Sequence, residues 1–117
     1  MKVLVALAIA AAVGAQNTPT VYKPGNGVTL PIPIREVRPQ YTQAARDAHI
    51  QGRVLLDVVV LADGEVGDVN IAQSLDTTYG LDEQALTAMK QWEFRPGKKD
   101  GTPVAVQIQV EMTFKLK

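Results

Sequence analysis

The sequence contains no cysteine and only one histidine, His49, among its 117 residues. Disulfide bonds, thiolate metal sites and a cysteine nucleophile are therefore excluded, and a zinc site or a histidine-based triad would lack most of its partners. The missing cysteine also excludes the lipid-modified cysteine of a bacterial lipoprotein. We expect no enzyme activity, no resident metal and no cofactor.

An excess of charge of either sign is also missing, because 12 Lys and Arg residues balance 12 Asp and Glu residues. No overall electrostatic field would attract nucleic acid or an anionic membrane, so nucleic-acid binding is not expected. Apolar residues make up 46% of the chain and charged residues 21%, which is typical of a globular protein. The length indicates one domain.

The longest apolar run lies at the amino terminus. Lys2 precedes an uninterrupted apolar run, and small residues up to Ala15 follow it, which is the pattern of a secretory signal peptide. Residues 3–15 would form about 20 Å of helix, whereas the hydrocarbon core of a membrane is about 30 Å thick. We therefore assign residues 1–15 to a cleaved signal peptide rather than to an anchor, and expect an exported chain without a membrane span.

Proline and glycine interrupt residues 16–36, so no helix or central strand is expected there. Within this stretch every second residue is apolar, namely Val28, Leu30, Ile32 and Ile34. Such alternation predicts an extended segment with one apolar side. We expect residues 28–37 to form a strap that lies on the domain.

Residues 37–117 predict an α+β domain. A strand over 54–61, the hairpin turn at Asp63 and Gly64, and a return strand over 66–74 are followed by a long alternating strand from residue 104. A short helix over 42–49 is capped by Thr42, and a second helix over 81–91 repeats apolar residues at three- and four-residue intervals.

These elements fit a three-stranded antiparallel sheet of order 2-1-3 with both helices on one face. The helix between the second and third strands returns the chain to its starting end, so the third strand pairs with the first. The predicted core includes Val54, Leu56, Val58, Val60, Val69, Ile71, Leu86, Met89, Trp92, Phe94 and the even-numbered apolar residues of the last strand. On the opposite face, Leu55, Val59 and Leu61 require a cover, which is either the strap or a second copy of the protein.

The polar residues are interpreted as solvated or structural. His49 is expected at the surface end of a helix, while Asp57 and Glu111 lie on the open sheet face. The Asp63–Asp68 segment lacks the spacing of a helix-flanked calcium loop, so we interpret it as a hairpin turn. Arg95, Lys98 and Lys99 are considered for phosphate, but no glycine-rich phosphate loop precedes a helix.

The outer edge of the last strand is the feature with most functional content. An unpaired strand edge can accept an extended peptide as an added strand. Alternatively, the edge is blunted by Glu111, Lys115 and Lys117 and by the strap. The sequence of the strand by itself does not decide between an open and a blunted edge.

An ordered series of motifs in residues 37–117 resembles the C-terminal domain of TonB, the periplasmic energy transducer of Gram-negative bacteria. The residues of the resemblance are Pro39, Tyr41, Ala45, Arg46, Gly52, Val54, Asp63, Gly64, Val66, Ser74, Leu81, Asp82, Ala85, Leu86, the stretch Trp92, Glu93, Phe94, Arg95 and Pro96, then Gly101, Pro103, Val104 and Phe114. Their order and spacing are more specific than any one of them.

The resemblance implies a periplasmic binding module whose last strand pairs with the TonB box, an N-terminal segment of outer-membrane receptors for siderophores or vitamin B12. The implied pairing residues are Val104, Ala105, Val106, Gln107, Ile108, Gln109 and Val110, acting through main-chain groups. The alternative is a structural or self-associating envelope protein, whose partner would be a second copy in a homodimer.

Overall fold

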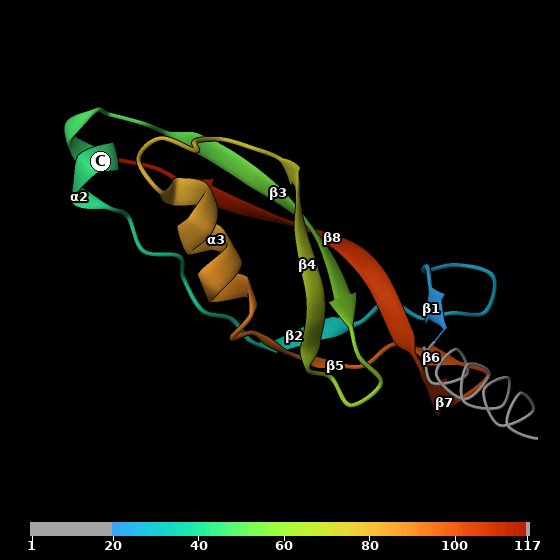
Figure 1. The fold of residues 1–117 in the computed structure, drawn as a ribbon. Helices are drawn as coiled ribbons and strands as arrows, with labels where there is room; N and C mark the ends of the chain where they lie inside the picture. Colours follow the sequence, from blue (N-terminus) through green and yellow to red (C-terminus); the bar gives the residue numbers. More distant parts are fainter. Residues whose placement is uncertain (1–19, 117) are drawn as a thin grey trace, which may run out of the picture.

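The computed structural model describes residues 20–116 and shows two short helices and eight strands within them (Figure 1). The predicted signal peptide, residues 1–15, lies outside the described residues. In chain order the elements are β1 (Val21–Tyr22), β2 (Ile32–Arg35), α2 (Gln43–Asp47), β3 (Gly52–Val60), β4 (Val66–Gln73), α3 (Leu81–Met89), β5 (Glu93–Arg95), β6 (Lys98–Lys99), β7 (Thr102–Pro103) and β8 (Ala105–Phe114).

The main sheet has the order β1-β8-β3-β4. β3 pairs antiparallel with both β4 and β8, and β1 pairs parallel with β8. The three expected strands are present, with β3 between the other two, but the prediction of a three-stranded sheet was wrong because β1 adds a fourth strand. β1 comprises two residues, which is too short to show the alternation from which a strand is predicted.

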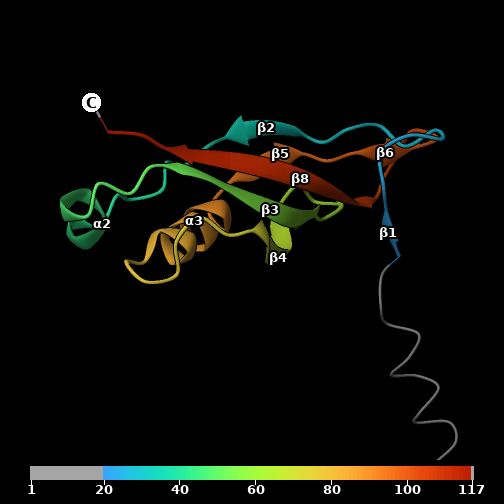
Figure 2. The same ribbon diagram turned by 90° about the horizontal axis from the view of Figure 1, so that it is seen from above.

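Alternating burial along β3 separates the core from the open face of the sheet. Val54, Leu56, Val58 and Val60 are fully buried, whereas the residues between them are half-buried, as period-two alternation predicts. α3 packs on the buried face, and Figure 2 shows it on the opposite side of the sheet from β2. The other buried core members are Ala45, Leu81, Ala85, Ala88, Met89, Phe94, Met112 and Phe114.

Of the remaining residues predicted for the core, Val69, Ile71, Leu86 and Trp92 pack against it while only partly buried. For Val69 and Ile71 the alternation alone could not show this, because β4 is the edge strand of the sheet and one side of it faces solvent. Thr42 is the N-cap of α2, and its Oγ1 accepts a hydrogen bond from the N–H of Ala45 at 3.1 Å, so the predicted cap is confirmed. α2 lies at the end of the sheet where β8 terminates (Figures 1 and 2).

Residues 28–37 are extended, and they are held by β5 rather than by the open face of the sheet. β2 pairs antiparallel with β5, and the N–H of Thr29 donates to the carbonyl of Lys98 at 2.8 Å. Three of the four alternating apolar side chains of this strap point to solvent, since Leu30 is 61% exposed, Ile32 52% and Ile34 60%. Only the fourth, Val28, is buried, and Leu55, Val59 and Leu61 remain half-buried.

The start of α3 is stabilised by two buried carboxylates, Asp76 and Asp82. Burial alone would raise the pKa of the Asp76 carboxyl, but the N–H groups of Tyr79, Leu81 and Thr78 donate to it and hold its pKa below the usual 3.8. Asp82 accepts hydrogen bonds from the backbone of the loop that precedes the helix. These bonds fix the β4–α3 connection.

Candidate functional site

The outer edge of β8 is occupied at one end only. β1 pairs with Ala105 and Val106, and the N–H of Val104 donates to the carbonyl of Gly97 at 3.0 Å. Beyond Val106, no strand within residues 20–116 pairs with this edge. Main-chain donors and acceptors on the outer side of residues 107–114 are therefore without a ladder partner in the described part of the chain.

The structure divides the predicted pairing residues into two groups. Val104 precedes β8 and Ala105 and Val106 are buried, so these three lie in the part of the edge that already has neighbours. Gln107, Ile108, Gln109 and Val110 lie in the open part, and they are half-buried or exposed. The open edge also continues past Val110 to Phe114, beyond the pairing residues that the family resemblance implies.

Three hollows lie beside β8 along the open part of its edge. A hollow of about 300 Å³ lies beside residues 107–109, where Leu30 and Asp57 also border it. Another of about 170 Å³ lies between residues 36–39 and residues 111–113. The largest, of about 810 Å³, lies at the carboxyl end of the strand, beside residues 113–116. The surface beside the open edge can therefore receive side chains of an added strand.

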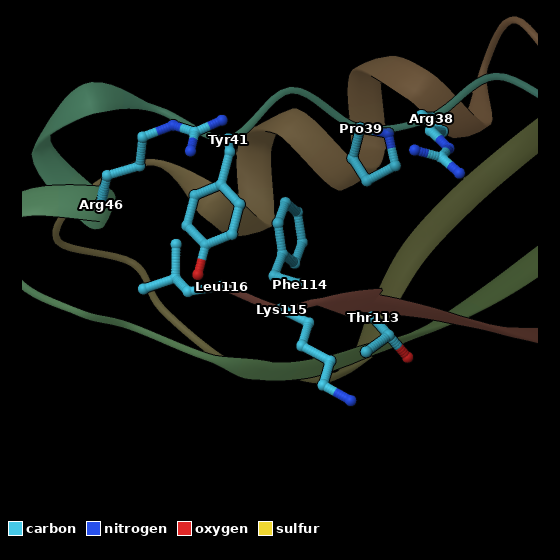
Figure 3. A pocket seen from close by; sticks show the side chains of 8 residues that line it. All are labelled: Arg38, Pro39, Tyr41, Arg46, Thr113, Phe114, Lys115 and Leu116. Carbon is cyan, nitrogen blue, oxygen red and sulfur yellow. The ribbon is translucent and has the colours of Figure 1, made fainter.

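The largest hollow is built around the contact of Tyr41 with Phe114 (Figure 3). The two rings meet edge to face with centroids 5.5 Å apart, and the Tyr41 hydroxyl donates to the carbonyl of Ile50. The guanidinium of Arg46 lies over the Tyr41 ring, 5.0 Å from its centroid. Both ends of the tyrosine are thus fixed, and Arg46 is held beside the hollow.

The residues considered for catalysis do not form a catalytic arrangement. His49 is exposed at the end of α2. The carboxylate of Asp57 accepts a hydrogen bond from Gln109 Nε2 at 3.3 Å, while Glu111 pairs with Arg53 Nη1 at 2.9 Å. The two carboxylates therefore have separate partners and do not form an acid–base pair.

Two of the residues considered for ions, Asp63 and Lys99, make contacts within the protein. Asp63 Oδ1 accepts the N–H of Glu65 at 2.9 Å within the hairpin turn, and Lys99 Nζ lies 4.9 Å from the centre of the Tyr22 ring. Across residues 20–116, no three His, Asp or Glu side chains are close enough to hold a metal ion together. Nor does that part of the chain contain a helix of the length and apolarity needed to cross a membrane.

Sequence reasoning missed the cations around the largest hollow, which are Arg38, Arg46 and Lys115. Arg46 appeared among the family motifs without a role, and the three residues share no helical or strand periodicity. In the folded chain all three line one hollow, because α2 and the segment before it lie at the end of β8. A charge-neutral sequence gives no signal for a local cluster of this kind.

The comparisons with known proteins all find relatives of one family. The family model described as "Gram-negative bacterial TonB protein C-terminal" matches residues 37–116. Protein TonB of Vibrio cholerae serotype O1 is 39% identical over 84 residues, covering 69% of this chain and 33% of that protein. Protein TonB of Pseudomonas aeruginosa is 30% identical over 84 residues, covering 72% of this chain and 24% of that protein.

A solved structure shows the same fold. The solution NMR structure of the Pseudomonas aeruginosa TonB CTD aligns with a TM-score of 0.60 and 27% identity, covering 80% of this chain and 90% of that one. The chain matches about a third or less of the length of the two curated relatives. The similarity thus concerns their C-terminal part.

Proposed function

Since the chain belongs to the family of Gram-negative TonB C-terminal domains, we propose that it serves TonB-dependent transport as a periplasmic binding module. It adds an N-terminal segment of an outer-membrane receptor, the TonB box, as an extra strand on the outer edge of β8. Binding requires no catalysis, metal or cofactor. Residues 107–114 make the main-chain contacts, because β1 already pairs with Ala105 and Val106.

The observation that carries this proposal is the open edge of β8. A strand in the middle of a sheet has both sides paired, whereas a long strand with one free side offers a row of main-chain donors and acceptors. β1 itself pairs with the start of this edge, so the geometry of the edge allows a strand to be added. The hollows beside β8 offer room for alternate side chains of the peptide.

Amide chemical shifts of the labelled protein, titrated with peptides from the N-termini of outer-membrane receptors, test the proposal. We expect the largest shifts at residues 107–114, with small shifts at 54–60 on the neighbouring strand. If every such peptide leaves the amides of 107–114 unchanged, the proposal fails.

A matched pair of proline variants tests whether the backbone of β8 does the binding. Successive N–H groups of a strand point to opposite edges, so one of Gln109→Pro and Val110→Pro removes an outward donor and the other an inward donor. We expect the outward variant to fold and lose peptide binding. The inward variant should instead lose stability, because it breaks the ladder with β3.

Self-association is the second candidate function, and exposed apolar residues favour it. Val21 of β1 and Leu30, Ile32 and Ile34 of the strap are each at least 43% exposed. Burying such residues between two copies would remove apolar surface from water. Light scattering that shows only monomer at high concentration would count against this alternative.

A further inference from the structure

The strap presents aliphatic and cationic side chains together on its outer side. Leu30 is 61% exposed, Ile32 52% and Ile34 60%. In β5, Phe94 is buried in the core, so its neighbour Arg95 points the opposite way. Arg95 is the cross-strand partner of Ile32, so these two side chains share the side that faces away from the core.

Further cations lie at the other end of the strap. Lys23 and Leu30 line the same hollow. The N–H of Thr29 donates to the carbonyl of Lys98 at 2.8 Å, which places β6 beside the start of the strap. β6 consists of Lys98 and Lys99, and both are exposed. Exposed aliphatic residues of the strap are therefore flanked by cations along its whole length.

The carboxylates of this layer are fewer than its cations. Glu93 is paired with Arg35 at 3.3 Å, so together they add no net charge. The other acidic residues in 20–37 and 93–103 are Glu36 and Asp100. The other cations in these two stretches are Lys23, Arg95, Lys98 and Lys99. The layer is therefore positively charged.

The opposite side of the molecule is acidic. Figure 2 shows β2, β5 and β6 along one side and α3 and β4 along the other. β4 and the start of α3 lie within residues 54–83, a stretch with several Asp and Glu residues and no Lys or Arg. The balanced charge of the whole chain thus conceals two sides of opposite sign, and such a protein is oriented by a charged surface.

We propose that the strap side binds an anionic lipid bilayer. Leu30, Ile32 and Ile34 enter the headgroup region, and Lys23, Arg95 and Lys98 lie beside lipid phosphates; we refer to these six residues as the strap face. Aliphatic side chains that enter the interface leave water, and anionic lipids attract the cations beside them. A second copy fits less well, because a two-fold contact places the same cations against each other. The inference does not depend on strand addition at β8.

Sedimentation with lipid vesicles tests the proposal. The chain from Gln16 onward is used, since it keeps all of the described fold and omits the apolar residues 3–15, which would themselves bind lipid. Vesicles of phosphatidylcholine with phosphatidylglycerol should bind about tenfold tighter or more than phosphatidylcholine alone, because each cation near an anionic surface contributes roughly fivefold. Salt should weaken this binding, because the Debye length falls from about 10 Å at 0.1 M to about 3 Å at 1 M. Equal binding to both vesicles, or none, would overturn the proposal.

A matched pair of arginine variants locates the charge. Arg95→Gln removes a cation of the strap face and should weaken binding to phosphatidylglycerol vesicles about fivefold. Arg46→Gln removes an exposed cation of α2, which Figure 2 shows away from β2, and should leave vesicle binding unchanged. If both variants weaken vesicle binding equally, net charge and not the strap face attracts the lipid, and the inference is wrong.

Serine variants test the aliphatic side chains. The double variant Ile32→Ser with Ile34→Ser should bind vesicles about tenfold more weakly, since less apolar surface leaves water. Leu30→Ser, which lies outside β2 and β5, should also weaken binding and does not depend on their pairing. Tyr79→Ser, at a residue 39% exposed before α3, should have no effect. Unchanged vesicle binding of both strap variants would contradict insertion of the strap.

Two further measurements distinguish the other occupants and the proposed function. If light scattering shows that the parent protein is a dimer and the Ile32→Ser, Ile34→Ser variant a monomer, a second copy covers the strap and the inference is wrong. The same variant should keep the amide shifts at 107–114 with receptor peptides. Loss of vesicle binding with those shifts retained supports a lipid surface separate from the β8 edge, whereas loss of both would assign the strap residues to the peptide site.

Discussion

Tyr41 and Phe114 meet edge to face, with ring planes at 84° and centroids 5.5 Å apart. Phe114 is the last residue of β8, and Tyr41 precedes the cap of α2. The contact therefore joins the segment before α2 to the end of the strand on which the proposed function depends. It also places the Tyr41 ring beneath the guanidinium of Arg46.

The Tyr41 hydroxyl can be tested apart from its ring. Tyr41→Phe keeps the contact with Phe114 and removes the donor to the Ile50 carbonyl. We expect the free energy of unfolding to fall by about 1 kcal/mol, measured by urea denaturation. Tyr41→Leu should cost about 1 kcal/mol more, because the aromatic contacts are lost as well. Equal stability of Tyr41→Phe and the parent protein would contradict the role of the hydroxyl.

Gly64 and Gly101 form a matched pair for alanine substitution. Both have positive φ, +91° and +83°, but a Cβ on Gly64 would lie 2.1 Å from the carbonyl oxygen of Phe94, whereas nothing lies within 4 Å of a Cβ on Gly101. Gly101→Ala should cost about 1 kcal/mol from the backbone conformation alone. Gly64→Ala should cost about 3 kcal/mol, because β5 must also move. Similar thermal midpoints for the two variants would contradict the close approach of Phe94.

The lowered pKa of Asp76 predicts that the protein loses stability in acid. Its pKa in the folded state is lowered, because three backbone N–H groups donate to the carboxylate and outweigh its burial. The stabilisation is complete above the usual pKa of 3.8 and is lost as the pH falls through the folded pKa. Urea denaturation at neutral pH and at about pH 3 should show this decrease. In Asp76→Asn the loss of stability between neutral and acidic pH should be smaller than in the parent protein. If the variant loses as much stability in acid as the parent, other groups cause the loss.

Trp92 links the strap to the core. Its Nε1 donates to the carbonyl of Val37, and its ring lies beside Phe94 with centroids 6.0 Å apart. Trp92→Phe should retain much of the ring packing. It should lower the free energy of unfolding by about 1 kcal/mol and loosen the segment around Val37. Hydrogen exchange should become faster in residues 28–40 while the amides of β3 remain protected. Uniformly faster exchange throughout the sheet would indicate global destabilisation instead.

Periodicity alone predicted much of the fold. Val54, Leu56, Val58 and Val60 alternate with less buried residues because successive side chains of a strand point to opposite faces. Leu81, Ala85 and Met89 identified α3 because residues three or four apart share a helix face. Thr42 identified the start of α2 through its short hydroxyl side chain. These are local rules, and they hold before the chain folds.

Contacts between distant segments were decided only by the tertiary structure. Val21 and Tyr22 pair with Ala105 and Val106 across more than eighty positions, and a two-residue strand has no periodicity to reveal it. The pairing of β2 with β5 turned Leu30, Ile32 and Ile34 to solvent, although their alternation predicted only that they share a side. Arg38, Arg46 and Lys115 line one hollow because α2 and the segment before it lie at the end of β8. The sequence determined which segments are extended or helical, since propensity and periodicity act locally, whereas the open length of β8 and the charge beside it depend on which segments pack together.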